Sequence, residues 1–321
     1  MILLLGASTY VGRAFARALG RRKDSFIPLS RNAFDYTRFE SLFDYVRKVK
    51  PELVINAADH PEKPDCDGET DRSTMLQVNT LLPQTIARVC SLTNTDFGHV
   101  SSGSIYSGAK LARNGQVRIE EDLGSAPIRT LFELDPKQLA GFTEEDQPNF
   151  CFSSPGSTFY SGTKALAEEA LRQGQAYIWR LRLPFNEQDD PGNFLSQLQD
   201  GWKAHDAINS LSHLDECVAA CLELWERHAA VGIYNVTNPG PLRTRQIIQL
   251  LQQHLKPVRP LELLVYRDEP TNGDRPPRSD CVLDSSKLLR AGVRLRSAQQ
   301  ALEHSLEKWV PQPVPALKTL A

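Results

Sequence analysis

The feature that most limits the fold of this chain is the alternation of short apolar runs with longer segments of helical periodicity. The apolar runs predict strands at residues 2–5, 26–29, 53–58, 98–102 and 177–183. Apolar residues at helical spacing predict helices at 13–19, 39–49, 75–92 and 159–172. Strands and helices that alternate in this way form βαβ units. We therefore expect an α/β fold built on a doubly wound parallel sheet.

Residues 108–155 interrupt this alternation. They mix glycine, proline, aspartate and glutamate with little periodicity, so we expect a long surface excursion. Structureless segments of this length are unusual unless they have a function, and a lid over a site is one such function. Beyond Pro184 the pattern is more broken, with helices predicted at 210–226, 244–255 and 297–309.

The composition excludes several classes of partner. The net charge of the 321 residues is −2, which gives no basic field for nucleic acid or for an anionic membrane. No run approaches the roughly 20 apolar residues of a membrane span, and Ile2–Leu5 is too short for the core of a signal peptide. None of the six cysteines forms a Cys-x-x-Cys pair, and no second pair accompanies Cys217 and Cys221. We expect a cytoplasmic protein with free thiols and without a metal.

A glycine-bounded turn follows the first predicted strand and leads into a helix. Glycines at such a turn let backbone N–H groups approach a pyrophosphate, which the helix N-terminus then faces. The turn predicts a dinucleotide site formed by Gly6, Ser8, Thr9, Tyr10, Val11 and Gly12. Thr9 takes the place of the middle glycine of such patterns and adds a side chain near the phosphates. A plain strand–helix turn is the alternative interpretation.

The end of the second predicted strand bears on the choice of dinucleotide. An acidic residue there bonds the ribose 2′-OH of NAD, whereas an arginine can pair with the 2′-phosphate of NADP. Ser30-Arg31 occupies this position, so we expect NADPH, with NADH as the alternative. Asp35 is placed to touch the adenine end. The other interpretation of Arg31 is a solvated surface residue.

Tyr160 and Lys164 place a phenol and an ammonium four residues apart on one predicted helix, and so on one face. A nearby cation favours the phenolate, and we expect it to lower the pKa of Tyr160 from about 10 toward neutrality. Tyr160 could then exchange a proton with a ketone or an alcohol. A hydroxyl at the end of the fourth strand, Ser102 or else Ser104, can hydrogen-bond the substrate carbonyl.

These motifs, taken in order, resemble the extended short-chain dehydrogenase/reductases, which have a Rossmann-like fold. The matching residues are Gly6 to Gly12, Asn56-Ala57-Ala58, Asn79, Ser101 to Tyr106, Tyr160 and Lys164. The chain is most similar to the nucleotide-sugar 4-keto reductases, including the dTDP-4-dehydrorhamnose reductases and the plant UDP-rhamnose epimerase/reductases. That closer likeness lies in residues 141–150, 160–169, 180–184, 193–194, 234–240 and 275–287.

The resemblance implies NADPH-dependent reduction at C4 of a 4-keto-6-deoxy nucleotide sugar. It makes Tyr160 the proton donor, Lys164 its electrostatic partner and Ser102 the carbonyl ligand. It adds a second set of cofactor contacts, namely Ala57, Ala58, Asn79 and Leu183. It also implies substrate contacts at Ser104, Asn193 and Arg275, although a structural salt bridge is an equal interpretation of Arg275.

We expect residues 1–183 to form an NAD(P)-binding domain, to which the chain returns around 208–240. Residues 184–321 then form mainly a smaller α/β substrate-binding domain. A homodimer is an expectation from the fold class alone.

Two other functions remain open at this point. One is an epimerase or dehydratase that retains bound NAD, and the other is a non-catalytic regulatory member of the family. Against epimerisation, Ser104 stands where the plant epimerase/reductases carry a cysteine. Against dehydration, Gly103 follows Ser102 where dehydratases place an acidic residue. The intact Tyr160–Lys164 pair argues against a purely regulatory role.

Overall fold

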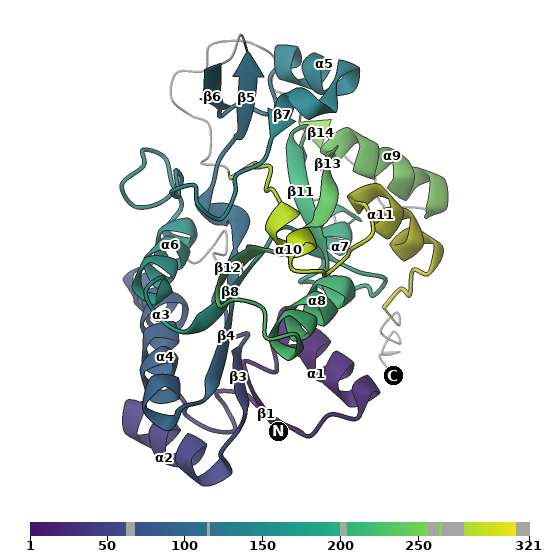
Figure 1. Cartoon of the computed structure of the whole chain (residues 1–321). Coiled ribbons are helices and arrows are strands. Elements are labelled where there is room, and N and C mark those ends of the chain that lie inside the picture. The colour runs from purple at the N-terminus through teal and green to yellow at the C-terminus, as the bar shows by residue number, and fades with distance from the viewer. Residues whose placement is uncertain (62–67, 114–115, 200–203, 256–262, 265–278, 313–321) are drawn as a thin grey trace, which may run out of the picture.

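A six-stranded parallel sheet forms the centre of the protein (Figure 1). The computed structural model describes residues 1–61, 68–113, 116–199, 204–255, 263–264 and 279–312. The strands of the large sheet are β1 (Ile2–Leu5), β2 (Phe26–Leu29), β3 (Leu53–Asn56), β4 (Asp96–Ser102), β8 (Ala176–Leu181) and β12 (Gly232–Asn235). Their order across the sheet is β2-β1-β3-β4-β8-β12. The predicted doubly wound α/β fold is confirmed.

Helices cover both faces of this sheet. The covering helices are α1 (Tyr10–Arg22) and α8 (Leu214–Glu226) on one face, and α2 (Phe39–Val49), α4 (Leu82–Thr93) and α6 (Phe159–Leu171) on the other. In β1, Ile2 and Leu4 pack toward α1 and α8, whereas Leu3 and Leu5 pack toward α2 and α4. Burial on both faces explains why the strand sequences are continuous apolar runs instead of alternating ones.

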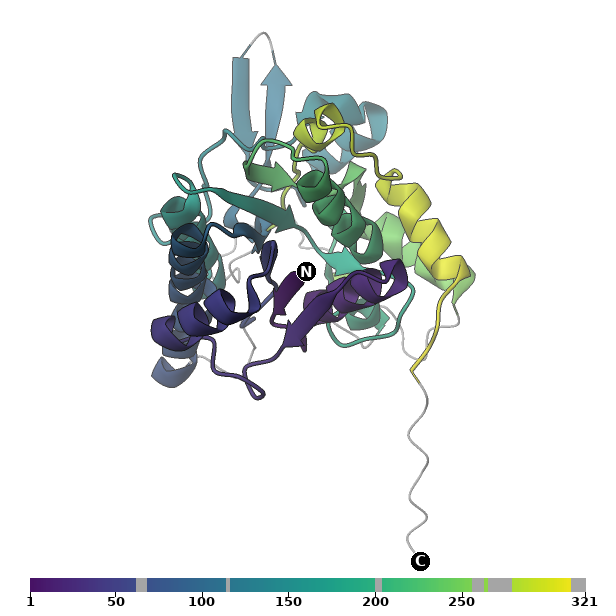
Figure 2. The same ribbon diagram turned by 60° about the horizontal axis from the view of Figure 1, so that its bottom comes forward.

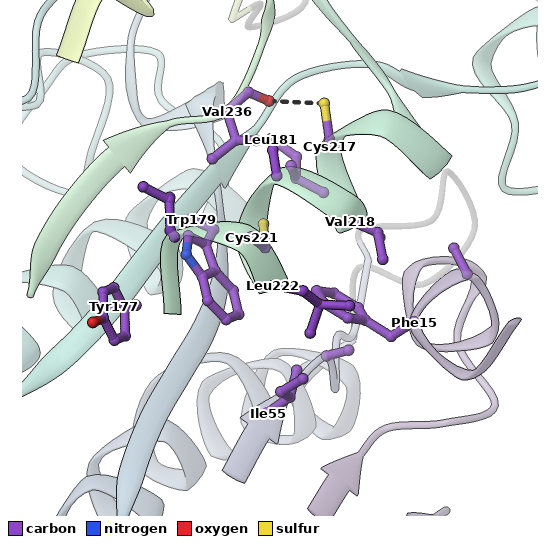
Figure 3. Packing of buried hydrophobic residues seen from close by; sticks show 14 of the residues in the cluster. Phe15, Ile55, Tyr177, Trp179, Leu181, Cys217, Val218, Cys221, Leu222 and Val236 are labelled. Carbon is purple, nitrogen blue, oxygen red and sulfur yellow. Dashed lines mark hydrogen bonds between the residues drawn. The ribbon is translucent and has the colours of Figure 1, made fainter. Parts of the chain in front are cut away.

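The cluster between the sheet and the α1–α8 face is built around large rings and thiols (Figure 3). The rings of Phe15 and Trp179 stack with their centroids 6.0 Å apart. Cys217 and Cys221 of α8 lie in the same cluster and are 0% and 1% exposed. The thiol of Cys217 donates to the carbonyl oxygen of Val236 over 3.3 Å. This packing joins α8, which comes late in the chain, to the first helix and the sheet.

The strand order reverses between β1 and β3. The chain leaves β1 toward β2 on one side and resumes at β3 on the other side. In open α/β sheets, ligands bind where the strand order reverses in this way. The Gly6 turn follows β1, and the segment from Ala57 follows β3, so both lie at this position.

The helix predicted at 75–92 is interrupted by a π-helical turn. The segments are α3 (Glu69–Leu76), the π-turn η1 (Gln77–Leu81) and then α4. A π-turn inserts one extra residue per turn and is frequent at functional sites. Asn79 lies in this turn with its side chain completely buried.

The prediction of an irregular excursion at 108–155 is wrong for much of its length. The short helical turn η2 (Gly103–Ile105) precedes the segment. The segment itself contains β5 (Ala109–Arg113), β6 (Gln116–Glu120), α5 (Ala126–Leu134), η3 (Pro136–Gln138) and β7 (Leu139–Ala140). These strands form their own antiparallel sheet, in the order β6-β5-β7. Leu111, Ile128 and Phe132 bury a separate small core beneath it. Figure 2 shows the β5–β6 hairpin extending away from the central sheet.

The remaining elements include a third sheet, of three strands in the order β13-β11-β9, and a two-stranded sheet of β10 and β14. They are β9 (Pro184–Phe185), α7 (Phe194–Gln199), β10 (Ala204–His205), β11 (Ile208–His213), β13 (Asn238–Arg243), α9 (Thr244–His254), β14 (Leu263–Leu264), α10 (Ser286–Arg290) and α11 (Ala298–Glu307). The helix predicted from residue 210 is wrong over 210–213, which belong to β11. There the hydroxyl of Ser212 donates to the carbonyl of Val236 over 2.7 Å, so a polar residue is satisfied inside the core. No helix in the described part of the chain is long and apolar enough to cross a membrane.

Candidate functional site

The turn after β1 requires glycine at both of its ends. Gly6 has a φ of +76°, and a Cβ atom there would lie 2.3 Å from the amide nitrogen of Ala58. A Cβ atom on Gly12 would lie 2.0 Å from the carbonyl oxygen of Gly6. The turn, the start of α1 and the segment after β3 therefore pack backbone against backbone, as the predicted dinucleotide site requires.

The side chain of Thr9 forms hydrogen bonds within the turn and to the segment after β3. Its backbone is extended, with φ −70°, so no glycine is needed at this position. Its hydroxyl caps α1 by accepting from the N–H of Gly12 over 2.9 Å, and it donates to the carbonyl of Ala57 over 2.8 Å. The side chain thus ties the turn together and points into the protein backbone, not out toward a ligand.

The other predicted cofactor residues surround this turn in different ways. The hydroxyl of Tyr10 donates to Asn186 over 2.9 Å, which links the start of α1 to the loop after β9. Ser8 and Arg31 are exposed, Ser30 and Val11 are partly buried, and Ala57 and Ala58 are buried. The carboxylate of Asp35 accepts from the N–H and the hydroxyl of Thr37, which lowers the pKa of Asp35.

A carboxylate joins the two groups of the predicted catalytic pair. Lys164 Nζ lies 2.8 Å from Asp59 Oδ1, and the hydroxyl of Tyr160 donates to the same oxygen over 3.3 Å. Lys164 Nζ lies 5.5 Å from the centre of the Tyr160 ring. Ser102 also interacts with the phenol of Tyr160 and acts to lower its pKa. The structure therefore brings together Ser102, Tyr160 and Lys164, with Asp59 as an additional member.

The expectation of a lowered pKa for Tyr160 is wrong in this arrangement. Burial of the phenol, followed by the charge and hydrogen bond of Asp59, raises the pKa of Tyr160 well above its usual range. Ser102 and Arg182 act in the opposite direction but do not outweigh them. The expectation for the pKa of Tyr160 considered only the ammonium of Lys164. In the structure, Asp59 offsets that charge at 2.8 Å.

A buried ion pair fixes the helix that carries Tyr160 and Lys164. α6 begins at a cap in which Thr158 accepts from the N–H of Ser161 over 3.0 Å. One turn after Lys164, Glu168 pairs with Arg180 of β8 at 2.6 Å, and their side chains are 1% and 0% exposed. The hydroxyl of Ser101 in β4 donates to Glu168 over 2.6 Å. This face of α6 is thus locked to the centre of the sheet.

Asn79 fixes the backbone next to Asp59. Its amide accepts from the N–H of His60 over 2.9 Å and donates to the carbonyl of the same residue over 3.0 Å. It also donates to Thr163 of α6 over 3.3 Å. The π-turn therefore connects the segment after β3 with α6.

The predicted substrate residues occupy three different environments. Ser104 is 8% exposed, and its hydroxyl has no hydrogen-bond partner among the described residues. The amide of Asn193 is completely buried and donates to the backbone carbonyls of Asn186 and Gln188. Arg275 lies outside the described residues. Leu183, a predicted cofactor contact, has a φ of +39°, an unusual conformation for a side chain of this size.

Sequence reasoning missed three members of this site. Asp59 follows the strand that ends in Asn56, and its place at the carboxyl end of a parallel strand was the available signal. Glu168 continues the spacing of Tyr160 and Lys164 by one more turn. Tyr36, whose hydroxyl accepts from the N–H of Gly6 over 3.1 Å, had no signal because it follows an irregular segment.

The doubly wound sheet, the glycine turn and the helix carrying Tyr160 and Lys164 together define a Rossmann-type protein. A model of the RmlD substrate binding domain family matches residues 1–310. The chain belongs to this family.

Two relatives from Arabidopsis thaliana show similar levels of identity. A bifunctional dTDP-4-dehydrorhamnose 3,5-epimerase/dTDP-4-dehydrorhamnose reductase is 28% identical over 266 residues, which cover 82% of this chain and 79% of the relative. A trifunctional UDP-glucose 4,6-dehydratase/UDP-4-keto-6-deoxy-D-glucose 3,5-epimerase/UDP-4-keto-L-rhamnose-reductase is 28% identical over 278 residues, or 85% of this chain. The chain spans only 37% of the length of that trifunctional protein.

Solved structures share the fold at lower identity. The UDP-rhamnose synthase from Acanthamoeba polyphaga mimivirus superimposes with a TM-score of 0.77 at 19% identity, covering 96% of this chain and 98% of that chain. A dTDP-4-dehydrorhamnose reductase from Bacillus anthracis, in complex with NADP, gives a TM-score of 0.69 at 15% identity, covering 96% and 97%. At these identities the likeness establishes the fold.

Proposed function

We propose that the chain is an NADPH-dependent reductase of a 4-keto-6-deoxy nucleotide sugar, with NADH as the alternative cofactor. The observation that carries this proposal is the meeting of Ser102, Tyr160 and Lys164 at the carboxyl ends of the strands of the large sheet. The names of the Arabidopsis relatives support the substrate class, because both include the reduction of a nucleotide-linked keto- or dehydrorhamnose.

The residues around Gly6 fit a dinucleotide in two respects. At Gly6 and Gly12 a side chain would meet the backbone of Ala58 and of Gly6, so glycine is what allows the tight strand–helix turn that a pyrophosphate site needs. The first turn of α1 carries no acidic side chain, so the positive end of the helix is available to a pyrophosphate. We assign the 2′-phosphate of NADPH to Arg31, which is exposed after β2.

Four residues of the chain have roles in the proposed reaction. NADPH, when bound, supplies the hydride. Ser102 donates a hydrogen bond to the carbonyl oxygen, and Tyr160 gives its phenolic proton to that oxygen as negative charge develops there. Lys164 stabilises the phenolate that remains until solvent returns the proton. The free, buried hydroxyl of Ser104 is available to a hydroxyl of the sugar.

The proposal includes a division of labour along the chain. Residues 1–183 bind the cofactor, residues 184–321 bind mainly the sugar nucleotide, and the chain returns to the first part within 208–240. The pairing of β12 with β8 in the large sheet supports that return. The proposal also includes a cytoplasmic location, supported by buried thiols such as Cys217, and a homodimer, supported by the fold class alone.

The test is an assay of the purified chain with NADPH and either dTDP- or UDP-linked 4-keto-6-deoxy sugar. We expect loss of the nicotinamide absorbance with at least one sugar. Tyr160→Phe should lower kcat by about 10²–10⁴-fold, the usual range for a general acid, while NADPH binding by fluorescence persists. Tyr45→Phe on α2 makes the same chemical change away from the site and should leave the rate unchanged.

Two results would count against this function. Purified protein that carries tightly bound NAD and consumes no NADPH would indicate an epimerase or dehydratase. Protein that shows no turnover with either nucleotide, and whose properties do not change in Tyr160→Phe, would indicate a binding role.

A further inference from the structure

Asp59 is the one carboxylate that contacts both groups of the Tyr160–Lys164 pair in the described part of the chain. We propose that Asp59 is a positioning residue. It holds the phenol of Tyr160 as a hydrogen-bond donor, and so keeps on Tyr160 the proton that the reduction requires. The inference rests on the proposed function, because it assigns a role within that site. The role of Asp59 goes beyond the proposed function, because the chemistry assigned there requires only the phenol, the ammonium and a serine hydroxyl.

The charge of Asp59 balances the charge of Lys164. The ammonium of Lys164 is 3% exposed, so its favourable interactions must come from the protein. Asp59 supplies an opposite charge at 2.8 Å, which leaves the pair close to neutral and removes the main force that would draw a proton from Tyr160. The same oxygen accepts from the phenol, and a carboxylate can accept that bond only while the phenol keeps its proton.

The protein fixes Asp59 in place. Asp59 lies three residues after the end of β3, and Asn79 bonds both backbone groups of the next residue, His60. The imidazole of His60 is in turn bonded to Asp71 of α3 at 2.8 Å. Asn79 and Asp71 therefore hold the segment after β3 in place. The carboxylate of Asp59 in this segment contacts α6, which the Glu168–Arg180 ion pair joins to the sheet.

Charged groups from three elements of the described chain act on Tyr160. Lys164 comes from α6 itself, Asp59 from the segment after β3, and Arg182 follows β8. Ser102 at the end of β4 acts with Arg182 to lower the pKa of Tyr160. The guanidinium of Arg182 is bonded to Asn209 at 2.7 Å, which fixes it in place. Burial and Asp59 prevail over Ser102 and Arg182, and the pKa of Tyr160 is raised.

The test measures the ionisation of Tyr160 directly. The ultraviolet absorbance of tyrosinate is followed against pH, and the signal of the Tyr160→Phe counterpart is subtracted. Asp59→Asn keeps the shape of the side chain and removes its charge. We expect the ionisation constant of Tyr160 to rise by about tenfold or more in this variant, since a neighbouring charge shifts a pKa by about one to three. The alkaline limb of kcat/KM for reduction should move to lower pH by the same amount.

Two further variants make the result specific. Asp71→Asn removes a carboxylate from the same region that bonds His60, and should leave the titration of Tyr160 at the wild-type position. Asp59→Glu keeps the carboxylate and should restore wild-type behaviour. If Asp59→Asn fails to fold, as judged by circular dichroism, Asp59→Ser replaces it in the same measurement.

The outcomes separate this inference from the proposed function. An active wild type whose Asp59→Asn variant keeps both the titration and the alkaline limb would overturn the role of Asp59 and leave the reductase standing. Absence of turnover in the wild type would remove the reductase. The absorbance titration would then still decide whether Asp59 controls the proton of Tyr160.

Discussion

At the scale of single residues, the protein buries an ion pair in its interior, where charged side chains are rare. Arg180 and Glu168 are 0% and 1% exposed, and three guanidinium–carboxylate hydrogen bonds join them. Arg180 also lies over the ring of Tyr106, 5.1 Å from its centre. Such a pair stabilises a fold only while both partners are present, because a lone buried charge is costly.

We therefore predict that Glu168→Gln lowers the free energy of unfolding by about 3–5 kcal/mol, the usual cost of breaking a buried pair. Urea denaturation followed by circular dichroism measures this. The double variant Glu168→Met with Arg180→Met removes both charges and should be more stable than Glu168→Gln alone. Equal stability of the wild type and Glu168→Gln would show that the pair does not hold α6 to the sheet.

Much of the candidate site could be predicted at this scale, and one part could not. The spacing of Tyr160 and Lys164 is set by one helix, so four residues in sequence already place them together. Asp59 reaches the same point from another strand, and no local pattern reports which loop residue a helix will meet. The direction of the pKa of Tyr160 depended on that missing residue.

At the scale of elements, several helices end in the same way. The residue after α1, α2 and α4 is left-handed, with φ values of 59° at Lys23, 51° at Lys50 and 52° at Asn94. Glycine is favoured at such positions because it has no Cβ, and asparagine tolerates them better than lysine. Lys23 and Lys50 are therefore strained helix ends.

Lys50→Gly should raise the free energy of unfolding by about 1 kcal/mol, because the exposed side chain loses little packing and the strain is relieved. Lys48→Gly, two residues earlier and inside α2, is the matched control and should lower it by about 1 kcal/mol. Thermal unfolding of both variants measures the difference. The same sign for both changes would contradict the assignment of Lys50 to a left-handed cap.

Apolar strands buried on both faces were predictable, whereas an exposed strand and a buried strand with polar residues were not. β1 and β3 are continuous apolar runs because helices cover both of their faces. β6 is an edge strand whose Val117 and Ile119 are 66% and 48% exposed, so its alternation carries no burial signal. β11 is buried throughout but includes Ser210 and Ser212, whose bonds to other segments cannot be read from spacing.

At the scale of the whole molecule, one carboxylate joins distant elements. Glu187 follows β9, and its Oε1 lies 3.2 Å from His213, which caps α8, and 3.7 Å from His304 of α11. Partial burial alone would raise its pKa, but the hydrogen bond from His213, a backbone hydrogen bond and the charges of His213 and His304 together outweigh burial. They lower the pKa of Glu187 from 4.5 to about 2. The contact links the helix on the large sheet with the last helix of the described chain.

This shift has a definite consequence in acid. The folded state holds the Glu187 carboxylate more strongly than the unfolded chain does, so its stabilisation is complete above pH 4.5 and is lost as pH falls toward about 2. Glu187→Gln should therefore be less stable than the wild type at neutral pH, and this difference should shrink below pH 4.5. Urea denaturation at several pH values measures it. Glu145→Gln, at an exposed carboxylate, should show no such convergence.

The thiols of α8, which are buried against the central sheet, allow local opening of the protein to be measured by chemical labelling. Burial raises the pKa of Cys217 and Cys221, so neither presents a reactive thiolate while α8 stays packed. Cys151 lies nearer the surface, where burial is outweighed by hydrogen bonds with Ser153 and Ser154 that lower its pKa. An alkylating reagent should modify Cys151 promptly and reach the α8 thiols only through transient detachment of that helix. The slow phase of labelling then gives the free energy of that local opening, without any denaturant.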